Sequence, residues 1–198
     1  NLKNPVLHNC QSSSAIPLSQ LHLYSHAEGR SPVLDTDRFS TEQAVAFGVG
    51  LRHRIKEHAA AAGCKRIMIL TTPQQSDLGL ELAEALGAMA AGIFCKAAMH
   101  TPTDVTEEAL AHLTEARADS VLAAGGGSTI GLGKALALRA DILQIALPTT
   151  YAGSECTPIL GQTADGVKTT MSDPKLRPGI VLYDPALVAG GPPLGGPD

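Results

Sequence analysis

The sequence has few aromatic residues, no tryptophan and no excess of positive charge, and these shortages argue against several kinds of protein. Aromatic side chains make up only 3% of the 198 residues, so the stacking surfaces of single-stranded nucleic-acid binders are not expected. The formal net charge is -4, which gives no electrostatic basis for binding nucleic acid or an anionic membrane surface. A small-molecule ligand is therefore the expectation.

Long apolar runs are also missing. The run ALALRA, for example, is broken by Arg139, and no stretch approaches the roughly 20 apolar residues of a transmembrane helix. The first residues, NLKNPVLHNCQSSSA, contain no apolar signal-peptide core, which favours a cytoplasmic location.

Metal-ligand motifs are absent from the pattern of cysteine and histidine. The four cysteines are scattered, with no C-x-x-C pair, and they predict reduced, mostly buried thiols rather than a disulfide framework or a zinc site: Cys10, Cys64, Cys95 and Cys156. The seven histidines include no H-E-x-x-H. No metal site is predicted.

What the sequence does contain is an alternation of apolar strands and amphipathic helices. Strands are predicted at 66–70, 91–95, 119–124, 143–147 and 180–185, and helices at 76–86, 104–116 and 129–140. Nearly continuous apolar strands separated by helices of about three turns indicate βαβ units and a parallel sheet. The predicted fold is α/β, Rossmann-like, with flanking helices and a β-hairpin around an Asp-Gly turn at 164–166.

The boundaries of this unit are set by composition. Residues 1–40 are polar and irregular, and we expect an extended arm there, whereas 189–198 form a Gly/Pro-rich tail. The α/β domain then spans 41–188. Its start is ambiguous: Ser40 and Gln43 form a capping-box pattern for a helix, yet AVAFGVG (44–50) favours a strand and a glycine turn, with a helix from Leu51. We prefer the strand.

The stretch VLAAGGGSTIGLGKALAL (121–138) places a glycine turn between a strand and a helix. Such a turn lets backbone N–H groups approach an anion at a helix N-terminus, so it is a candidate phosphate cradle. It matches neither common fingerprint, because Ser128 and Ala135 break the Walker A pattern and Ile130 replaces the third glycine of G-x-G-x-x-G. A tight crossing that only needs small residues is the alternative.

A second polar loop follows the next strand, in ALPTTYAGSE (146–155). Hydroxyl groups at the carboxyl end of a strand lie where open α/β sheets bind ligands. Two such loops after successive strands predict the two walls of one crevice. The alternative is a Ser/Thr-rich turn that bonds its own backbone.

Four segments now carry a family resemblance, in order along residues 44–188: LTTPQQ (70–75), MHTPTDVT (99–106), GGGSTIGLGKALALR (125–139) and LPTTYAGSECTPILG (147–161). They resemble the iron-dependent (type III) alcohol dehydrogenases, and most closely the maleylacetate reductase branch. Two departures from the wider family favour that branch, namely Gly131 in place of an Asp and the shortened PTTYAGSE. The branch reduces maleylacetate to 3-oxoadipate with NADH or NADPH, so the resemblance implies a dinucleotide-binding domain over 41–188 and a dicarboxylate substrate.

The resemblance also implies roles for residues of this chain. Gly126, Gly127 and Ser128 would hold the pyrophosphate, and Gly125 and Ser154 would also belong to the cofactor site. Thr149 and Thr150 would line the nicotinamide side, and Thr71 and Thr72 would lie near the adenine end. Thr101 and Pro102 would flank the cofactor, and Lys168 would reach toward the ribose and nicotinamide. Lys134 is either part of this site or an ordinary surface lysine. No catalytic residue is named. Because no acid follows the strand at 66–70 before Asp77, we expect both NADH and NADPH to be accepted.

The family's second, all-helical domain, with its metal-binding histidines, has no counterpart in these residues, and intact members are expected to be homodimers. Turnover by this chain alone is therefore expected to be weak or absent. A metal-dependent alcohol or glycerol dehydrogenase, and a non-catalytic nucleotide-binding module, remain the alternatives.

Overall fold

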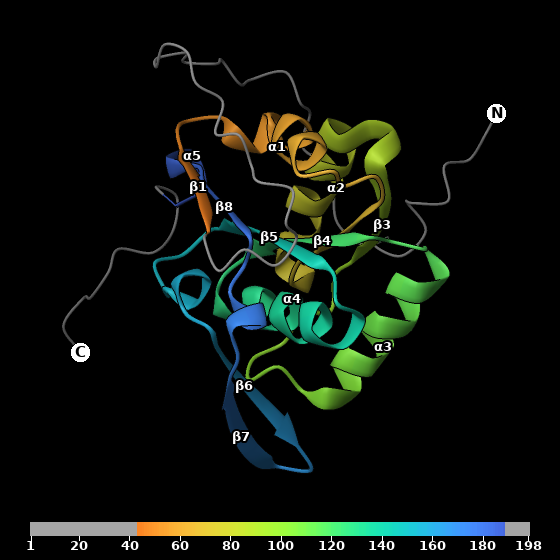
Figure 1. The fold of residues 1–198 in the computed structure, drawn as a ribbon, viewed down its shortest axis with the longest axis vertical. Coiled ribbons are helices and arrows are strands. Elements are labelled where there is room, and N and C mark those ends of the chain that lie inside the picture. Colours follow the sequence, from red (N-terminus) through yellow and green to blue (C-terminus); the bar gives the residue numbers. More distant parts are fainter. Residues whose placement is uncertain (1–42, 189–198) are drawn as a thin grey trace.

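The computed structural model describes residues 43–188, which form a six-stranded parallel sheet, helices on both of its faces and a separate hairpin (Figure 1). The strand order is β1-β8-β5-β4-β2-β3. The strands are β1 Ala44–Phe47, β2 Ile67–Leu70, β3 Ala90–Phe94, β4 Ser120–Gly125, β5 Leu143–Pro148 and β8 Ile180–Tyr183, and the hairpin is β6 Ile159–Ala164 with β7 Val167–Ser172. The predicted α/β fold with a parallel sheet and a hairpin is confirmed.

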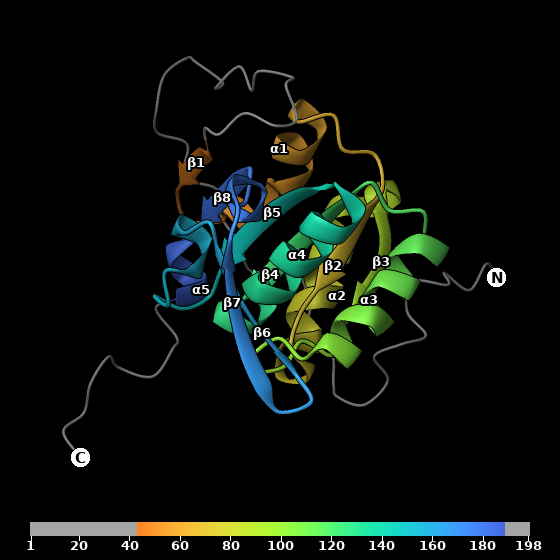
Figure 2. The same ribbon diagram turned by 60° about the horizontal axis from the view of Figure 1, so that its bottom comes forward.

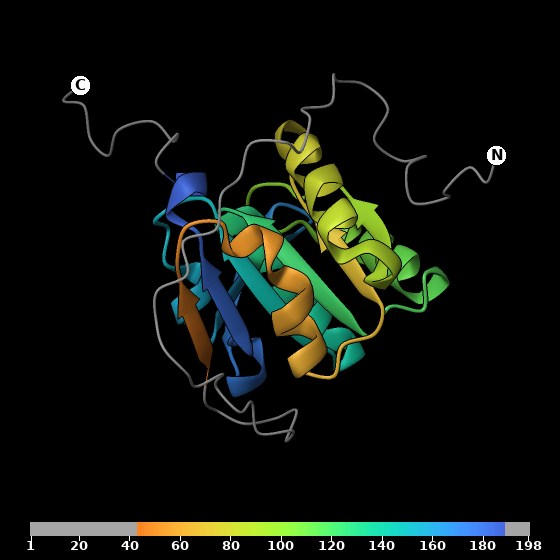
Figure 3. The ribbon, with the colours of Figure 1, turned by 90° about the horizontal axis from the view of Figure 1, so that it is seen from above.

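Helices connect the strands and cover the sheet. The α-helices are α1 Ile55–Ala61, α2 Ser76–Leu86, α3 Thr103–Glu115, α4 Gly127–Ala140 and α5 Pro185–Val188; the 3-10 helices are η2 Leu51–His53, η3 Pro73–Gln75, η4 Gly87–Met89, η5 Ser154–Cys156 and η6 Pro174–Leu176. Figure 2 brings α3 and α4 to the front of the sheet, and Figure 3 shows α1 and α2 on its other face.

The sheet lies between two layers of helices because its strands are apolar on both faces. In β2, Ile67 and Ile69 belong to the core shared with α1 and α2, whereas Met68 and Leu70 belong to the core shared with α3 and α4. All four side chains are buried. Successive strand residues point to opposite faces, so a run of four apolar residues is stable only between two layers of helices.

The ambiguous segment at the start of the domain is a strand. β1 occupies Ala44–Phe47 and pairs in parallel with β8, and Gly50, with φ of 80°, precedes the 3-10 helix η2 that begins at Leu51. The α-helical conformation begins later, at Ile55. The preferred interpretation of strand, glycine turn and helix is therefore confirmed, with the first helical turn tighter than predicted.

The hairpin turns at the predicted Asp-Gly pair. Ala164 faces Val167, and the two residues between them, Asp165 and Gly166, have φ of 49° and 75°. Two consecutive positive φ values are typical of the type I′ turn, whose twist matches that of the strands. The hairpin projects beyond the sheet (Figure 1), and every residue of β7 is exposed.

Three further predictions concern the chain as a whole. The predicted arm, 1–40, and tail, 189–198, lie outside the described residues, so the domain limits stay a prediction. Cys156 is a free thiol, as predicted, although it is exposed rather than buried, whereas Cys95 is disulfide-bonded, which the scattered cysteines did not predict. Between residues 43 and 188, no helix has both the length and the apolar character that crossing a bilayer requires.

Candidate functional site

The glycine turn lies where the order of strands in the sheet reverses. From β2 the chain runs outward to β3 at the edge, and it then returns past β2 to form β4 on the other side. Such a switch point leaves a crevice at the carboxyl ends of the two strands, where open α/β sheets bind ligands. Because β4 pairs with β2 on one side and β5 on the other, the loops after all three strands meet at this edge.

The N-terminal end of α4 opens into this crevice. Gly126 is the N-cap residue, and no side chain caps the helix. The N–H of Ile130 donates to the Gly126 carbonyl at 3.1 Å, so the N–H groups of Gly127, Ser128 and Thr129 have no partner within the helix. These N–H groups and the helix dipole together favour an anion such as a phosphate.

The turn before α4 has room for backbone only. A Cβ added to Gly126 would lie 3.1 Å from Thr150 Oγ1, and one added to Gly125 would collide with Thr129 Oγ1 and lie 2.9 Å from Gln75 Oε1. Thr150 belongs to the loop after β5. The two predicted walls of the crevice are thus in contact at the glycines.

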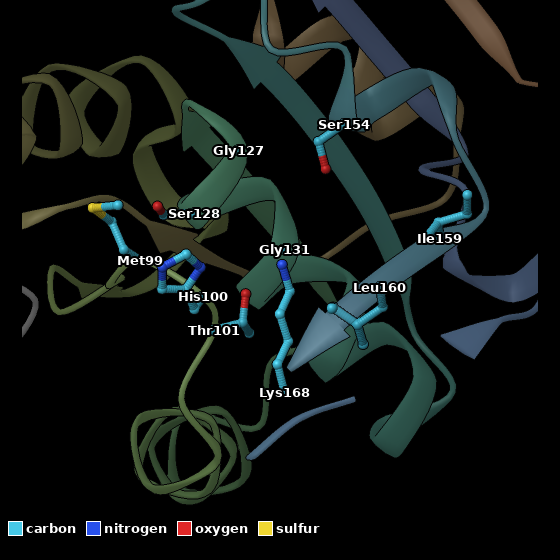
Figure 4. Close-up of a pocket in the computed structure, with 11 residues that line it drawn as sticks. Met99, His100, Thr101, Gly127, Ser128, Gly131, Ser154, Ile159, Leu160 and Lys168 are labelled. Carbon is cyan, nitrogen blue, oxygen red and sulfur yellow. The ribbon is translucent and has the colours of Figure 1, made fainter. Parts of the chain in front are cut away.

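A pocket of about 270 Å³ adjoins the first turn of α4 (Figure 4). Five residues predicted for the site line it: Thr101, Gly127, Ser128, Ser154 and Lys168. They come from the loop after β3, from α4, from η5 and from β7. In Figure 4 the Lys168 side chain extends toward Gly131 and Thr101, so the hairpin supplies a positive charge opposite the helix N-terminus.

The loop after β3 closes one side of the pocket in a strained conformation. His100 and Thr101 have φ of 65° and 46°, which is rare for residues with a Cβ and costly for a β-branched one. Thr101 Oγ1 lies 2.5 Å from where a Cβ on Gly131 would stand, so this conformation requires glycine there. The Thr101 carbonyl accepts a hydrogen bond from the Thr163 N–H at 3.4 Å, which ties the loop to the hairpin.

The other predicted residues lie around the crevice without lining the pocket. Gly125, Gly126, Thr149 and Thr150 border it, and Pro102 forms an isolated bridge with Thr163. Thr72 lies half-buried after β2. Thr71 is fully buried, and its hydroxyl group has no hydrogen-bond partner among the described residues, so its side chain belongs to the core.

Two functional candidates were missed by sequence reasoning. Gln75, in the quoted LTTPQQ, donates from Nε2 to Thr149 Oγ1 at 2.9 Å and so connects the loops after β2 and β5. His100 lines the pocket beside Thr101. No periodicity or motif spacing marks either residue.

The alternative of an ordinary surface lysine is wrong for Lys134, which is fully buried. Its Nζ donates to the carbonyls of Thr157 and Ile159 at 2.8 and 2.7 Å, and to Thr157 Oγ1 at 3.2 Å. Burial lowers the pKa of Lys134 to about 8, against the opposing effect of the Glu155 carboxylate. Lys134 thus connects α4 to the start of the hairpin, including Ile159, which lines the pocket.

The buried residue Glu155 anchors the loop after β5 to neighbouring parts of the fold. It is 4% exposed, and its Oε1 accepts a hydrogen bond from the Tyr183 hydroxyl at 3.0 Å. Burial and the hydrogen bonds to Cys156 and Glu155 raise the pKa of Tyr183 above its ordinary value. The backbone carbonyl of Glu155 accepts a hydrogen bond from Gln43 Nε2 at 2.7 Å. These contacts fix Ser154, the neighbouring residue that lines the pocket.

Comparisons with known proteins agree with this geometry. A family model described as iron-containing alcohol dehydrogenase matches residues 42–185. A maleylacetate reductase of Rhizobium sp. (strain MTP-10005) is 51% identical over 148 residues, which are 75% of this chain and 42% of that protein. A maleylacetate reductase of Sphingobium indicum is 48% identical over 143 residues, which are 72% of this chain and 40% of that protein.

Solved structures give the same result. The crystal structure of maleylacetate reductase from Agrobacterium tumefaciens superposes with a TM-score of 0.75 at 51% identity, covering 76% of this chain and 43% of that one. The chain therefore spans about two fifths of the length of the relatives it matches. Residues 43–188 contain no group of three or more His, Cys, Asp or Glu side chains placed to hold a metal ion, so they do not fit the iron of the family's name.

Proposed function

Because the chain belongs to the iron-containing alcohol dehydrogenase family, we propose that it binds NADH or NADPH at the N-terminus of α4. The observation that carries the proposal is this uncapped helix end at the switch point of the sheet, beside a pocket lined by Ser128, Ser154 and Lys168. Backbone N–H groups and one lysine suit the two negative charges of a pyrophosphate.

In this proposal the chain's own residues bind and orient the cofactor. The N–H groups of Gly127 and Ser128 donate to the pyrophosphate, while Lys168 adds a positive charge from the hairpin. Thr149 and Thr150 border the cofactor, and so does Thr72, because its hydroxyl and that of Thr149 are hydrogen-bonded to the same Gln75 amide. Thr101 acts by fixing the hairpin. When bound, the cofactor supplies the hydride.

The proposed reaction is the reduction of the carbon–carbon double bond of maleylacetate to 3-oxoadipate, in the degradation of aromatic compounds. This proposal is supported by two maleylacetate reductases that are 51% and 48% identical to this chain in sequence over the matched residues. Those relatives are more than twice as long as the matched segment. The activity is accordingly proposed for an enzyme of that length, with this chain supplying its cofactor-binding part.

The test of cofactor binding is Gly126→Val. The new side chain would meet Thr150 and cover the N–H groups of the helix end, so we expect NADH to bind about a hundredfold more weakly, or not measurably. Binding is followed by the fluorescence of NADH and by calorimetry. Gly92→Val is the matched control, because a Cβ on Gly92 meets nothing within 4 Å and the residue lies in β3, away from the crevice.

Two results would contradict the proposal. One is a folded wild-type chain that binds neither NADH nor NADPH, which would leave the glycines as a packing turn. The other is equal binding by wild type and Gly126→Val, since the helix end would then not be the site. Circular dichroism confirms that each variant has kept the sheet and its helices.

The substrate is tested with a chimera. Residues 43–185 of this chain replace the matching segment of the Rhizobium reductase, to which this chain is 51% identical. We expect the chimera to oxidise NADH in the presence of maleylacetate, and Gly126→Val to abolish this. A folded chimera that binds NADH but does not reduce maleylacetate would contradict the proposed role of this segment in that reaction.

A further inference from the structure

A second pocket lies at the base of the hairpin. Its volume is about 270 Å³, and it shares no lining residue with the pocket beside α4. The residues that line it precede β6, end β7, and form or follow η6: Pro158, Ser172, Pro174 and Arg177. The two prolines provide apolar walls, while a hydroxyl group and a guanidinium group supply polar atoms.

Hydrogen bonds fix the backbone around this pocket. The Asp173 N–H donates to the Pro158 carbonyl at 3.0 Å, which holds the two ends of the hairpin together. The Asp173 side chain also caps η6, because it accepts from the Lys175 N–H at 2.8 Å. The Arg177 N–H donates to the Pro174 carbonyl at 3.2 Å. The walls of the pocket are therefore formed before a ligand arrives, which reduces the entropy lost on binding.

The Arg177 guanidinium group has no ion pair or hydrogen bond with any residue between 43 and 188. The acids close to it in the fold have other partners: the Asp173 carboxylate caps η6, and the Asp141 carboxylate is paired with Lys175 at 2.9 Å. Burial and, to a smaller extent, the positive charge of Arg177 lower the pKa of Lys134. Two positive charges thus lie near the base of the hairpin, and that of Arg177 is available to an anion.

The lining favours a carboxylate with an apolar body. A guanidinium group binds a carboxylate through two parallel hydrogen bonds. The Ser172 hydroxyl, which has no hydrogen-bond partner in the described part of the chain, can donate to the same ligand. A phosphate dianion needs more donors than these, and the proline walls offer it none. The volume is close to the lower end of the range of small-molecule pockets, roughly 300–1,000 Å³, so the ligand is small.

We propose that this pocket binds a small organic monocarboxylate of about the size of benzoate. The carboxylate pairs with Arg177, the Ser172 hydroxyl donates to it, and the apolar body lies against Pro158 and Pro174. This site goes beyond the proposed cofactor function, because none of its lining residues takes part in that function.

The probe is benzoate, titrated into the isotopically labelled wild-type chain and followed by NMR and by calorimetry. We expect saturable binding with a Kd of about 1 mM or tighter, which is ordinary for so small a ligand. The amide signals of Ser172 and Arg177 should shift, whereas the prolines have no N–H to report. Benzamide has nearly the same shape without the charge, so it should bind at least about tenfold more weakly.

Arg177→Gln should weaken benzoate binding about tenfold or more, since it removes both the charge and the paired donors. Arg177→Lys keeps the charge without the planar pair of donors, so a smaller loss of about threefold is expected. The matched control is Arg117→Gln. Arg117 is also exposed and has no ion pair within residues 43–188, and it follows the C-terminal end of α3 without lining the pocket. Its replacement should leave the affinity within about twofold of the wild type.

Several results would each overturn this proposal. One is a folded wild-type chain that shows no saturable binding up to about 20 mM benzoate. Another is unchanged affinity in Arg177→Gln. Amide shifts at Gly127 and Ser128 in place of Ser172 and Arg177 would mean that benzoate occupies the helix end instead. Sulfate binding as tightly as benzoate would show that the prolines contribute nothing. NADH is titrated separately, so the failure of this site and the failure of the cofactor site are distinguishable.

Discussion

Asp184→Ala is expected to lower the free energy of unfolding by about 3–5 kcal/mol. The Asp184 carboxylate is fully buried at the end of β8. It accepts hydrogen bonds from the N–H groups of Gly50, Arg52 and Ala186 at 3.1, 3.3 and 3.1 Å, and from Arg52 Nη1 at 3.3 Å. Without the carboxylate, these three backbone N–H groups lose their acceptor. Arg52 also loses one of its two ion pairs and keeps only the one with Glu81.

This loss is large compared with the roughly 5–15 kcal/mol that stabilises a typical domain. Urea denaturation followed by circular dichroism measures it. Asp184→Asn keeps one acceptor oxygen and the shape of the side chain, so it should lose less, about 1–3 kcal/mol. A loss below about 1 kcal/mol for Asp184→Ala would contradict the importance of this network.

The elements of the fold could be predicted because each has a local signal. The helix at 76–86 has its apolar residues on one face, and the turn at Asp165 and Gly166 has the chemistry that a two-residue hairpin loop needs. The order of the strands has no such signal. β1 pairs with β8, and Ala44 faces Ile180, a partner 136 residues away that no local pattern identifies.

The candidate site likewise contains some residues that local sequence signals predict and others that they do not. The glycine turn and the hydroxyl loop after β5 were placed at one edge because both follow parallel strands, and the carboxyl ends of such strands share an edge. Thr71 was assigned to the site with them, but its side chain is buried in the core. Gln75 and His100 lie in two of the family-like segments, LTTPQQ and MHTPTDVT, but nothing in those segments singles them out, because their neighbours come from loops that meet only in the folded sheet.

Lys134 is the clearest case of long-range dependence. It lies in a helix that is apolar nearly all round, where a lysine normally reaches solvent. Instead its acceptors, the carbonyls of Thr157 and Ile159, arrive from the segment that leads into the hairpin. Because all three donors of the ammonium group are used, the charge is tolerated although burial lowers its pKa to about 8.

We expect Lys134→Met to lose about 1–2 kcal/mol of stability at pH 7, since the carbonyls of Thr157 and Ile159 lose the donor that they have in the fold. The difference from the wild type should then grow with pH. Below pH 8, Lys134 is protonated in both the folded and the unfolded chain, so it adds no pH dependence. Between about 8 and its ordinary 10.5, the unfolded chain keeps a proton that the folded chain has released.

In that window the free energy of unfolding of the wild type therefore rises with pH, by at most about 1.4 kcal/mol per pH unit. The reason is that the neutral amine carries no charge that burial would destabilise. Lys134→Met cannot show this gain. Urea titrations at pH 7.0 and 9.5 measure the difference, with Lys65→Met, an exposed lysine, as the control expected to change stability by less than about 0.5 kcal/mol at both pH values. A constant difference between wild type and Lys134→Met would mean that the ammonium keeps its proton in the fold. The hydrogen bonds to the three oxygens would then stabilise the charged form more than burial destabilises it, and Lys134 would hold the hairpin as a buried ammonium ion.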